Sequence, residues 1–207
     1  EDEGSLAGNN IFHLAEMDDH SLWVSSDMGG VSVLDLNGDI RRAGFRRITD
    51  KDGLSSINTR CTLQDNYGNV WVANYASGVD FITENTTSFN ILPYYQDQYS
   101  VGRNKRVYAI CSDEDGNLWL GGENELSLFR GGTFVQSWDL SPHLMQTYTV
   151  PYALLSDSDG NIWIGLNDEG VLKFNPENGS FKRISSPFWL LDVHALLEDE
   201  PGRVSGN

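Results

Sequence analysis

The decapeptide SDSDGNIWIG, residues 156–165, carries the side chains with the clearest potential for chemistry in this chain. Asp157, Asp159 and Asn161 offer oxygen atoms at alternating positions, as calcium loops do. Those loops also need a glycine in sixth place and a later bidentate glutamate. Here Gly160 is fourth counting from Asp157, and no such glutamate follows. The decapeptide is therefore predicted to contain a strand-joining turn, in which Asp and Asn accept backbone hydrogen bonds and Gly takes a positive φ.

The same string recurs along the chain, and this recurrence favours an architectural role over a metal site. Each copy contains a tryptophan, and the four tryptophans are spaced 48, 48 and 44 residues apart. A period of this size marks a solenoid, propeller or array. One tryptophan per repeat at one register predicts packing between sheets rather than sugar stacking. The predicted structural positions are Trp23, Trp71, Trp119, Trp163, Asp65, Asp113, Asp157, Gly68, Gly116 and Gly160.

Apolar residues within each repeat alternate or run in short stretches bounded by Gly, Asn and Asp, which indicates strands. Four short antiparallel strands per repeat are typical of a β-propeller blade. The fold class predicted is all-β, with four four-stranded repeats and the start of a fifth, forming one partial propeller over residues 1–207. The predicted blades are 10–48, 57–92, 106–138 and 150–184, with the next beginning at 192–207, where the array reads as cut.

Two repeats depart from the pattern at their turns. The first has Asp18-Asp19-His20-Ser21 where the others have Gly-Asn. The third lacks the glycine that Gly30, Gly78 and Gly170 supply seven residues after tryptophan. These departures leave the turn geometry of the two blades open, although not the blades themselves.

Charge and hydropathy exclude several classes of partner. The net charge of −16 would repel polyanions, so no nucleic acid is expected as a partner. No run of about 18 apolar residues exists, so this segment is not expected to insert into a membrane. Cys61 and Cys111 stand at different distances before the tryptophans of their repeats and are predicted to be two buried thiols rather than a disulfide. Their redox state and the redox compartment of the protein cannot be inferred from them.

The chain offers no convergent catalytic or metal-ligating set. Its four histidines stand on different repeats without metal-ligand spacing. No catalytic residue, metal or cofactor is therefore predicted. Because carboxylates from neighbouring blades can in principle pair as in glycosidases, a propeller hydrolase of the lactonase or sialidase kind stays open as an alternative.

Ligand binding is expected in the segments of the chain that do not belong to the repeat. The segments 92–106 and 138–152 are the two long insertions between blades. Aromatic rings beside Arg and Lys suit sugar stacking and pairing with uronate or sulfate, although long loops also pack down without any ligand. The candidate ligand-binding residues are Tyr94, Tyr95, Tyr99, Arg103, Lys105, Arg106, Trp138, His143 and Tyr148.

The repeat resembles a known family. D-x-x-G-N-[LIV]-W-[LIV]-G, then F-x-x-[IL] and DGLSS, as in Phe45 to Ser56, is similar to the two-component regulator propeller repeat. The resemblance implies part of a seven-bladed propeller in the periplasmic sensor region of a Bacteroidetes hybrid two-component system. It also implies further blades, an immunoglobulin-like domain, a membrane span and cytoplasmic histidine kinase modules elsewhere in the polypeptide.

The resemblance makes a non-catalytic sensor the expected function, with an oligosaccharide breakdown product as ligand and polysaccharide-utilisation genes as target. A propeller scaffold for protein–protein interaction or dimerisation is the first alternative, and the hydrolase is the second. Because end blades of an open array expose apolar faces, self-association of the chain is expected as well.

Overall fold

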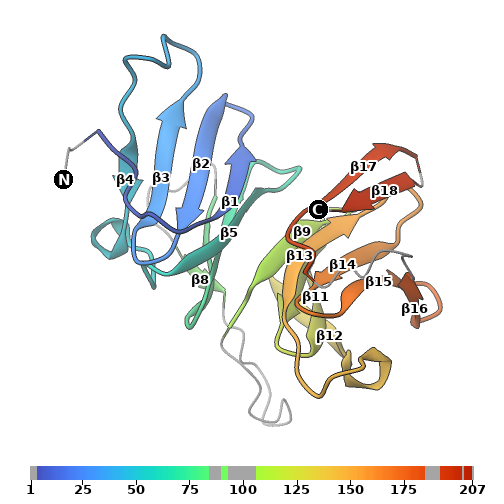
Figure 1. Ribbon diagram of the computed structural model, residues 1–207. Helices are drawn as coiled ribbons and strands as arrows, with labels where there is room; N and C mark the ends of the chain where they lie inside the picture. Colours follow the sequence, from blue (N-terminus) through green and yellow to red (C-terminus); the bar gives the residue numbers. More distant parts are fainter. Residues whose placement is uncertain (1–3, 84–89, 93–105, 185–191, 202, 207) are drawn as a thin grey trace. The chain divides into compact units, whose positions relative to one another are not determined.

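The computed structural model describes residues 4–83, 90–92, 106–184, 192–201 and 203–206 (Figure 1). The chain divides into unit 1, residues 1–101 and 105–107, and unit 2, residues 102–104 and 108–207. The predicted all-β class is confirmed, because the described residues form four four-stranded antiparallel sheets and one two-stranded sheet. The seven-bladed closure and the blade boundaries remain predictions.

Unit 1 contains two sheets in which consecutive strands are neighbours. The first is β1 (Ile11–Glu16), β2 (Ser21–Ser26), β3 (Gly30–Asp35) and β4 (Arg46–Ile48). A 3-10 turn, η1 (Asp50–Asp52), leads to the second sheet: β5 (Thr59–Gln64), β6 (Val70–Asn74), β7 (Gly78–Ile82) and β8 (Asn90–Leu92). The first strand of the second sheet, β5, packs against β1 and β2.

Unit 2 repeats the same arrangement. Its first sheet is β9 (Ala109–Ser112), β10 (Leu118–Gly122), β11 (Glu125–Arg130) and β12 (Thr133–Asp139), followed by η2 (Ser141–His143). The second is β13 (Pro151–Ser156), β14 (Ile162–Leu166), β15 (Gly170–Asn175) and β16 (Ser180–Ile184), and a hairpin of β17 (Leu196–Glu200) and β18 (Arg203–Gly206) follows. The first strands β9, β13 and β17 lie side by side, so we call the first strand of every sheet its inner strand.

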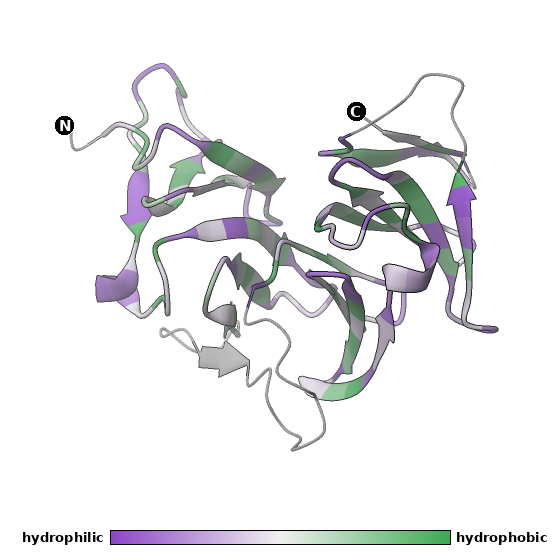
Figure 2. Ribbon diagram, turned by 60° about the horizontal axis from the view of Figure 1, so that its bottom comes forward, coloured by the Kyte–Doolittle hydropathy of each residue, from purple (hydrophilic) through white to green (hydrophobic). Residues whose placement is uncertain are grey.

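Each unit has an apolar core between its sheets. Trp23, Val31 and Ile48 of the first sheet are buried with Val70 and Val72 of the second. In unit 2, a second cluster of buried side chains lies between the two four-stranded sheets. Its members are Cys111, Trp119, Leu126, Leu128, Leu140, Ile162, Ile164, Leu166, Leu172 and Phe174. Figure 2 shows apolar residues concentrated in the strands and polar residues in the turns.

The glycine that follows tryptophan in W-[LIV]-G has a packing role. A Cβ added at Gly121 would lie 2.8 Å from Cβ of Pro151, and one at Gly165 would lie 2.8 Å from Cγ1 of Val193. Pro151 is the first residue of β13, and Val193 lies three residues before β17. The glycine therefore lets neighbouring sheets of unit 2 approach closely, which a side chain would prevent.

The turn that lacks the repeated glycine is shorter than its counterparts. In the third sheet Gly122 pairs with Glu125, so two residues connect β10 and β11, and Asn124 takes the positive φ of 54°. The fourth sheet uses three residues between Leu166 and Gly170. Asn tolerates the left-handed region, and it stands five residues after tryptophan, where Met28 and Asp168 also have a positive φ, of 56°. Glu125 takes the place of the glycine in the hairpin, opposite Gly122.

Both cysteines are buried and neither forms a disulfide. Cys61 lies in unit 1 and Cys111 in unit 2. The part of the chain that the structure describes contains no helix long and apolar enough to cross a membrane.

Asp80, on β7, is a charged group inside the core of unit 1. Its residue is fully buried, and its Oδ2 accepts hydrogen bonds from the Ser55 N–H at 2.8 Å and from Asn74 Nδ2 at 3.0 Å. Its Oδ1 is buried and has no hydrogen-bond partner among the described residues. Burial raises the pKa of Asp80, and the hydrogen bonds from Ser55 and Asn74 oppose this shift only in part.

Asp80→Asn should change how stability depends on pH. A raised carboxyl pKa means that ionisation of Asp80 costs folding free energy as the pH rises above about 4. The variant keeps an amide oxygen for the Ser55 N–H and cannot ionise. The melting temperature of the variant minus that of the wild type should therefore increase as the pH is raised from about 4 to 7. Thermal unfolding followed by circular dichroism measures both temperatures. A difference that stays constant across this range would show that Asp80 does not titrate as proposed.

Candidate functional site

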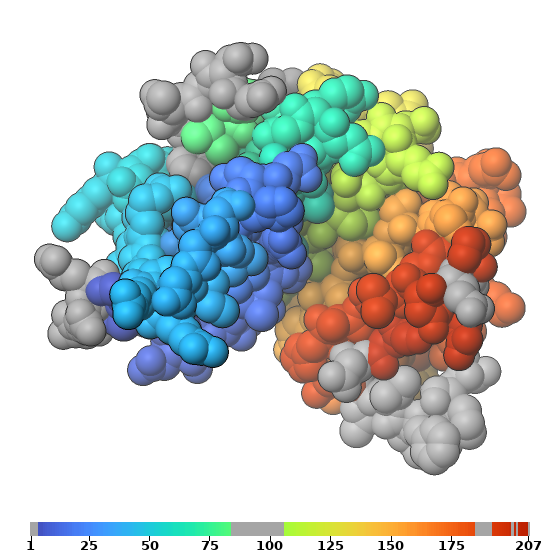
Figure 3. All heavy atoms as spheres, turned by 90° about the horizontal axis from the view of Figure 1, so that it is seen from above, coloured from blue at the N-terminus to red at the C-terminus, as the bar shows by residue number. Residues whose placement is uncertain are grey.

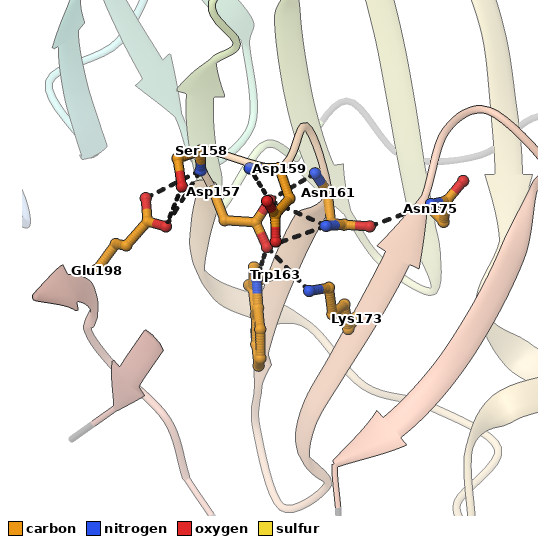
Figure 4. A network of polar contacts seen from close by, with 8 residues as sticks. All are labelled: Asp157, Ser158, Asp159, Asn161, Trp163, Lys173, Asn175 and Glu198. Atoms are coloured by element: carbon orange, nitrogen blue, oxygen red, sulfur yellow. Dashed lines mark hydrogen bonds and ion pairs between the residues drawn. The ribbon is translucent and has the colours of Figure 1, made fainter. Parts of the chain in front are cut away.

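The acidic turn at residues 156–165 is a network of hydrogen bonds around one carboxylate (Figure 4). Asp157 is buried, and its Oδ2 accepts from Trp163 Nε1 at 2.7 Å and pairs with Lys173 Nζ at 3.0 Å. Its Oδ1 accepts from the Asn161 N–H at 2.7 Å and from the Asp159 N–H at 3.1 Å. The carboxylate is therefore saturated by protein donors, as the turn prediction requires.

The same indole-to-carboxylate hydrogen bond occurs in two other sheets. Trp71 Nε1 donates to Asp65 Oδ2 at 2.8 Å, and Trp119 Nε1 donates to Asp113 Oδ2 at 2.9 Å. The turn glycines Gly68, Gly116 and Gly160 have φ values of 80°, 75° and 76°. Repetition with one geometry shows that Asp, Gly and Trp are parts of a single structural motif.

The first sheet builds this turn from different residues. The Met17 N–H donates to the Ser21 carbonyl at 2.9 Å, as the Asp157 N–H does to Asn161, and His20 takes the glycine's place with φ 59°. Because methionine replaces the carboxylate, Trp23 Nε1 donates to Ser21 Oγ at 3.0 Å, and Ser21 Oγ donates to Asp19 Oδ1 at 2.6 Å. Ser21 thus links the indole to the carboxylate of Asp19, two residues before the serine.

Hydrogen bonds keep the Asp157 carboxylate ionised. Burial alone would raise its pKa, but hydrogen bonds from Trp163, Asn161 and Lys173 outweigh this and hold the pKa below its usual range. Next to it, Glu198 of β17 accepts from the Ser158 N–H at 3.0 Å and from Ser158 Oγ at 2.7 Å. The turn thereby also anchors the hairpin that follows the fourth sheet.

The structure places four of the nine predicted ligand residues, while Tyr94, Tyr95, Tyr99, Arg103 and Lys105 lie outside the described residues. Trp138 packs against the core of unit 2, with its ring centroid 4.8 Å from that of Phe174. His143 stacks on Phe181 at 4.5 Å, and Phe181 in turn packs on Phe174. Trp138 and His143 are therefore brought together by one row of packed rings.

The segment between the third and fourth sheets is held down by two polar side chains. Glu169 is buried and accepts from the N–H groups of Met145 and Gln146 at 2.9 and 2.5 Å, while Arg183 Nη2 donates to it at 2.5 Å. Asn124 Oδ1 accepts from the Thr149 N–H at 2.7 Å. Residues 140–150 thus pack down onto the turns, as the alternative to ligand binding predicts for long loops.

A second repeated feature lies at the opposite end of the inner strands. Register shifts between Ile11 and His13, Thr59 and Cys61, and Pro151 and Ala153 place one extra residue at the start of β1, β5 and β13. Such bulges re-aim the extra side chain. We call these positions and their equivalents before β9 and β17 the bulge row: Phe12 and Arg60 in unit 1, and Tyr108, Tyr152 and His194 in unit 2.

The bulge row of unit 2 carries aromatic and polar groups that contact one another. Tyr152 and His194 stack with ring centroids 4.5 Å apart and an interplanar angle of 13°. The Tyr108 hydroxyl donates to Glu123 Oε1 at 3.1 Å. Tyr148, the remaining predicted ligand residue of this segment, is 51% exposed and contacts Tyr108. Only Tyr148 of this set was predicted from the sequence.

Burial raises the pKa of the Tyr108 phenol, and hydrogen bonding with Tyr148 and the neighbouring Glu123 raises it further. The phenol therefore keeps its proton at neutral pH and remains a hydrogen-bond donor. Aromatic faces beside hydroxyl and carboxylate groups form a surface that can stack on a ring and hydrogen-bond its hydroxyls.

Histidines do not cluster in the structure. The electrostatic interaction and hydrogen bond with Cys61 raise the pKa of His13 against the opposing effect of burial, and His20 contacts Glu16 at 3.2 Å. His143 and His194 stack on Phe181 and Tyr152. Within the described ranges, no group of three His, Cys, Asp or Glu side chains is arranged to hold a metal ion.

The meander sheets with adjacent inner strands define the chain as a β-propeller repeat protein. Residues 102–124 and 146–168 match the model of the two-component regulator propeller family. The predicted resemblance is thus confirmed for these two segments, which match the two-component regulator propeller repeat. No curated protein matches the chain.

Several solved structures share the fold. One is the extracellular domain assigned to a hybrid two component system of B. thetaiotaomicron, with 21% identity and a TM-score of 0.68 over 96% of this chain. Virginiamycin B lyase from Staphylococcus aureus matches with 13% identity and a TM-score of 0.67 over 90% of this chain. PorZ, a component of the type-IX secretion system of Porphyromonas gingivalis, matches with 13% identity and a TM-score of 0.70 over 100% of this chain. At these identities the likeness concerns the fold alone.

The chain is much shorter than these relatives. It covers 26% of the hybrid two component domain, 59% of the lyase and 32% of PorZ. The activities and partners of those proteins therefore do not carry over with the fold.

Asp157→Ala should destabilise the protein without changing its metal content. The substitution leaves the indole N–H, the Asn161 N–H and Lys173 without their acceptor, at a cost of about 3 kcal/mol of unfolding free energy. Urea denaturation measures this cost. Asp159→Ala, in the exposed part of the same turn, is the matched control and should lower the unfolding free energy by less than about 0.5 kcal/mol. Calcium release on unfolding of the wild type would contradict the structural role.

Glu169→Gln should loosen residues 140–150 while leaving the sheets folded. Burial opposes ionisation of Glu169, but hydrogen bonds from Arg183, Met145 and Gln146 lower its pKa, so its contribution is present at neutral pH and lost as the pH falls below about 4. The Met145 and Gln146 amides should exchange with solvent at least roughly 10-fold faster in the variant, measured by NMR. The exposed Glu177→Gln is the control, and equal exchange in both variants would refute the anchoring role.

Proposed function

We propose that this chain is part of the non-catalytic sensor region of a two-component signalling protein, and that unit 2 binds a glycan-derived ligand along its bulge row. One observation carries the proposal. The two segments that match the two-component regulator propeller family contain Tyr108, Glu123, Tyr148 and Tyr152. The repeats that indicate signalling therefore also carry the clustered aromatic and polar side chains.

The chemistry of these side chains suits a sugar. A pyranose ring has an apolar face for the Tyr152 and His194 rings, and hydroxyl groups that pair with Glu123 and the phenols. The side chains come from strand starts and turns, which are held by the sheets. Such a rigid arrangement reduces the entropy lost on binding.

The wider setting is proposed from the family resemblance. The remaining blades, an immunoglobulin-like domain, a membrane span and the histidine kinase would belong to other parts of the polypeptide. The sensor region would lie in the periplasm, and ligand binding would control polysaccharide-utilisation genes. The fold of the extracellular two component domain from B. thetaiotaomicron is consistent with this location. Self-association of the chain remains part of the proposal.

Tyr152→Ala should weaken glycan binding. Isothermal titration of the protein with a panel of neutral oligosaccharides should give at least one binder, and loss of the stacking ring should weaken it roughly 10-fold. Tyr67→Ala is the control, because Tyr67 is also exposed but belongs to the acidic turn between β5 and β6.

Three outcomes separate the candidate functions. Binding that Tyr152→Ala weakens and Tyr67→Ala does not supports the sensor. No heat from any oligosaccharide, together with self-association on size exclusion, supports a scaffold. Turnover of a glycoside or lactone would instead establish a hydrolase.

A further inference from the structure

Unit 1 holds an arginine–aromatic cluster, which we define as Phe12, Arg60, Tyr75 and Arg106. The Arg60 guanidinium carbon lies over the Phe12 ring at 3.9 Å and over the Tyr75 ring at 4.6 Å from the centroids. The Arg106 guanidinium lies over Tyr75 at 4.7 Å. Two cations thus share one aromatic ring, although the chain as a whole has a net charge of −16.

The cluster follows from the same strand bulges as the bulge row of unit 2. Phe12 and Arg60 are the bulged residues of β1 and β5, which pack against each other. Tyr75 begins the turn after β6. Glu123 occupies the equivalent position in the third sheet, at the start of the turn after β10. Figure 3 shows blue and turquoise atoms of unit 1 side by side at the surface. The register shifts place Phe12 and Arg60 at the starts of the inner strands β1 and β5.

Arg60 lacks the partner that its charge requires. Among the described residues, no carboxylate forms an ion pair with it, and its Nε is buried without a hydrogen-bond partner. Its side chain is held by the two rings instead. Phe12 is 46% exposed, and Arg60, Tyr75 and Arg106 are partly exposed, so the cluster is open to solutes.

Stacking on rings prepares a guanidinium for anion binding. The flat faces of the guanidinium contact the rings, while its N–H donors point outward in the guanidinium plane. That edge matches the two oxygens of a carboxylate or sulfate and binds them through paired hydrogen bonds. A second guanidinium nearby adds attraction and offsets the repulsion from the acidic surface.

We propose that the arginine–aromatic cluster binds an oxyanion of the ligand, and that the ligand of this protein is an acidic glycan. The inference deepens the proposed function, because a glycan supplies this group as a uronate carboxylate or as a sulfate ester. The rings of Phe12 and Tyr75 would pack beside the sugar that carries the group.

Titration of the whole chain with three probes tests the proposal: an oligogalacturonate, a sulfated disaccharide of glycosaminoglycan type, and a neutral oligosaccharide of similar length. At least one acidic probe should bind more tightly than the neutral one. Arg60→Gln should weaken that binding roughly 10- to 100-fold, because a charge-assisted pair of hydrogen bonds is lost. Arg60→Lys should restore it only in part, since an ammonium has no planar fork.

Arg42→Gln is the matched control, because the Arg42 side chain is 89% exposed and its one ion pair among the described residues is with Asp39 at 3.8 Å. Melting temperatures establish that each variant is folded. Salt should weaken the acidic probe's binding more than that of the neutral probe. The preferred acidic probe decides between carboxylate and sulfate.

Two results would overturn the oxyanion site: equal affinity for acidic and neutral probes, or unchanged acidic binding in folded Arg60→Gln. Neither would by itself remove the proposed function, because neutral glycan binding that depends on Tyr152 would persist. Failure of all three probes to bind would overturn the site and the proposed function together.

Discussion

One interaction recurs through both units and sets the geometry around it: a buried or half-buried carboxylate that accepts the indole N–H of the tryptophan six residues later. Asp65, Asp113 and Asp157 make this bond at 2.8, 2.9 and 2.7 Å. The same carboxylates accept the Asn69, Asn117 and Asn161 N–H groups, so each fixes the turn and the following ring at once. Because the ring then packs within its unit, the hydrogen bond connects turn geometry with the core.

The two ends of each inner strand consequently have different chemistry. At the acidic turn of the fourth sheet, both carboxylate oxygens of Asp157 already accept from protein donors. At the bulges, side chains stack on one another at the surface: Tyr152 on His194, and Arg60 on Phe12. Bulges turn single side chains out of the strand alternation, which is how a repeat fold can present a site without altering its sheets. The ligand site that we propose therefore lies at the bulge end.

The fold was readable from the sequence because its determinants are local. Asp157, Gly160 and Trp163 act within one turn, so their spacing alone predicts the hairpin and its repetition. The bulge row was missed because its members differ: Phe12, Arg60, Tyr108, Tyr152 and His194 share a position, not a residue type. Their only signal is their place before each inner strand. Trp138 was predicted as a ligand residue because it begins a long insertion. Its ring packs instead on Phe174, which comes close only because two sheets pack together, and the sequence alone does not show this contact.

The central claim is that the acidic turns are structural and that the bulge end of the inner strands recognises ligand. Mapping of backbone amide and tryptophan indole shifts by NMR, during titration with an oligosaccharide that binds, tests both halves in one experiment. The account predicts shifts at residues 108, 152 and 194 of unit 2 and at the turns beside them. The indole signals of Trp71, Trp119 and Trp163 should remain unchanged and slow to exchange. Shifts concentrated at the acidic turns, with none at the bulge row, would contradict the account.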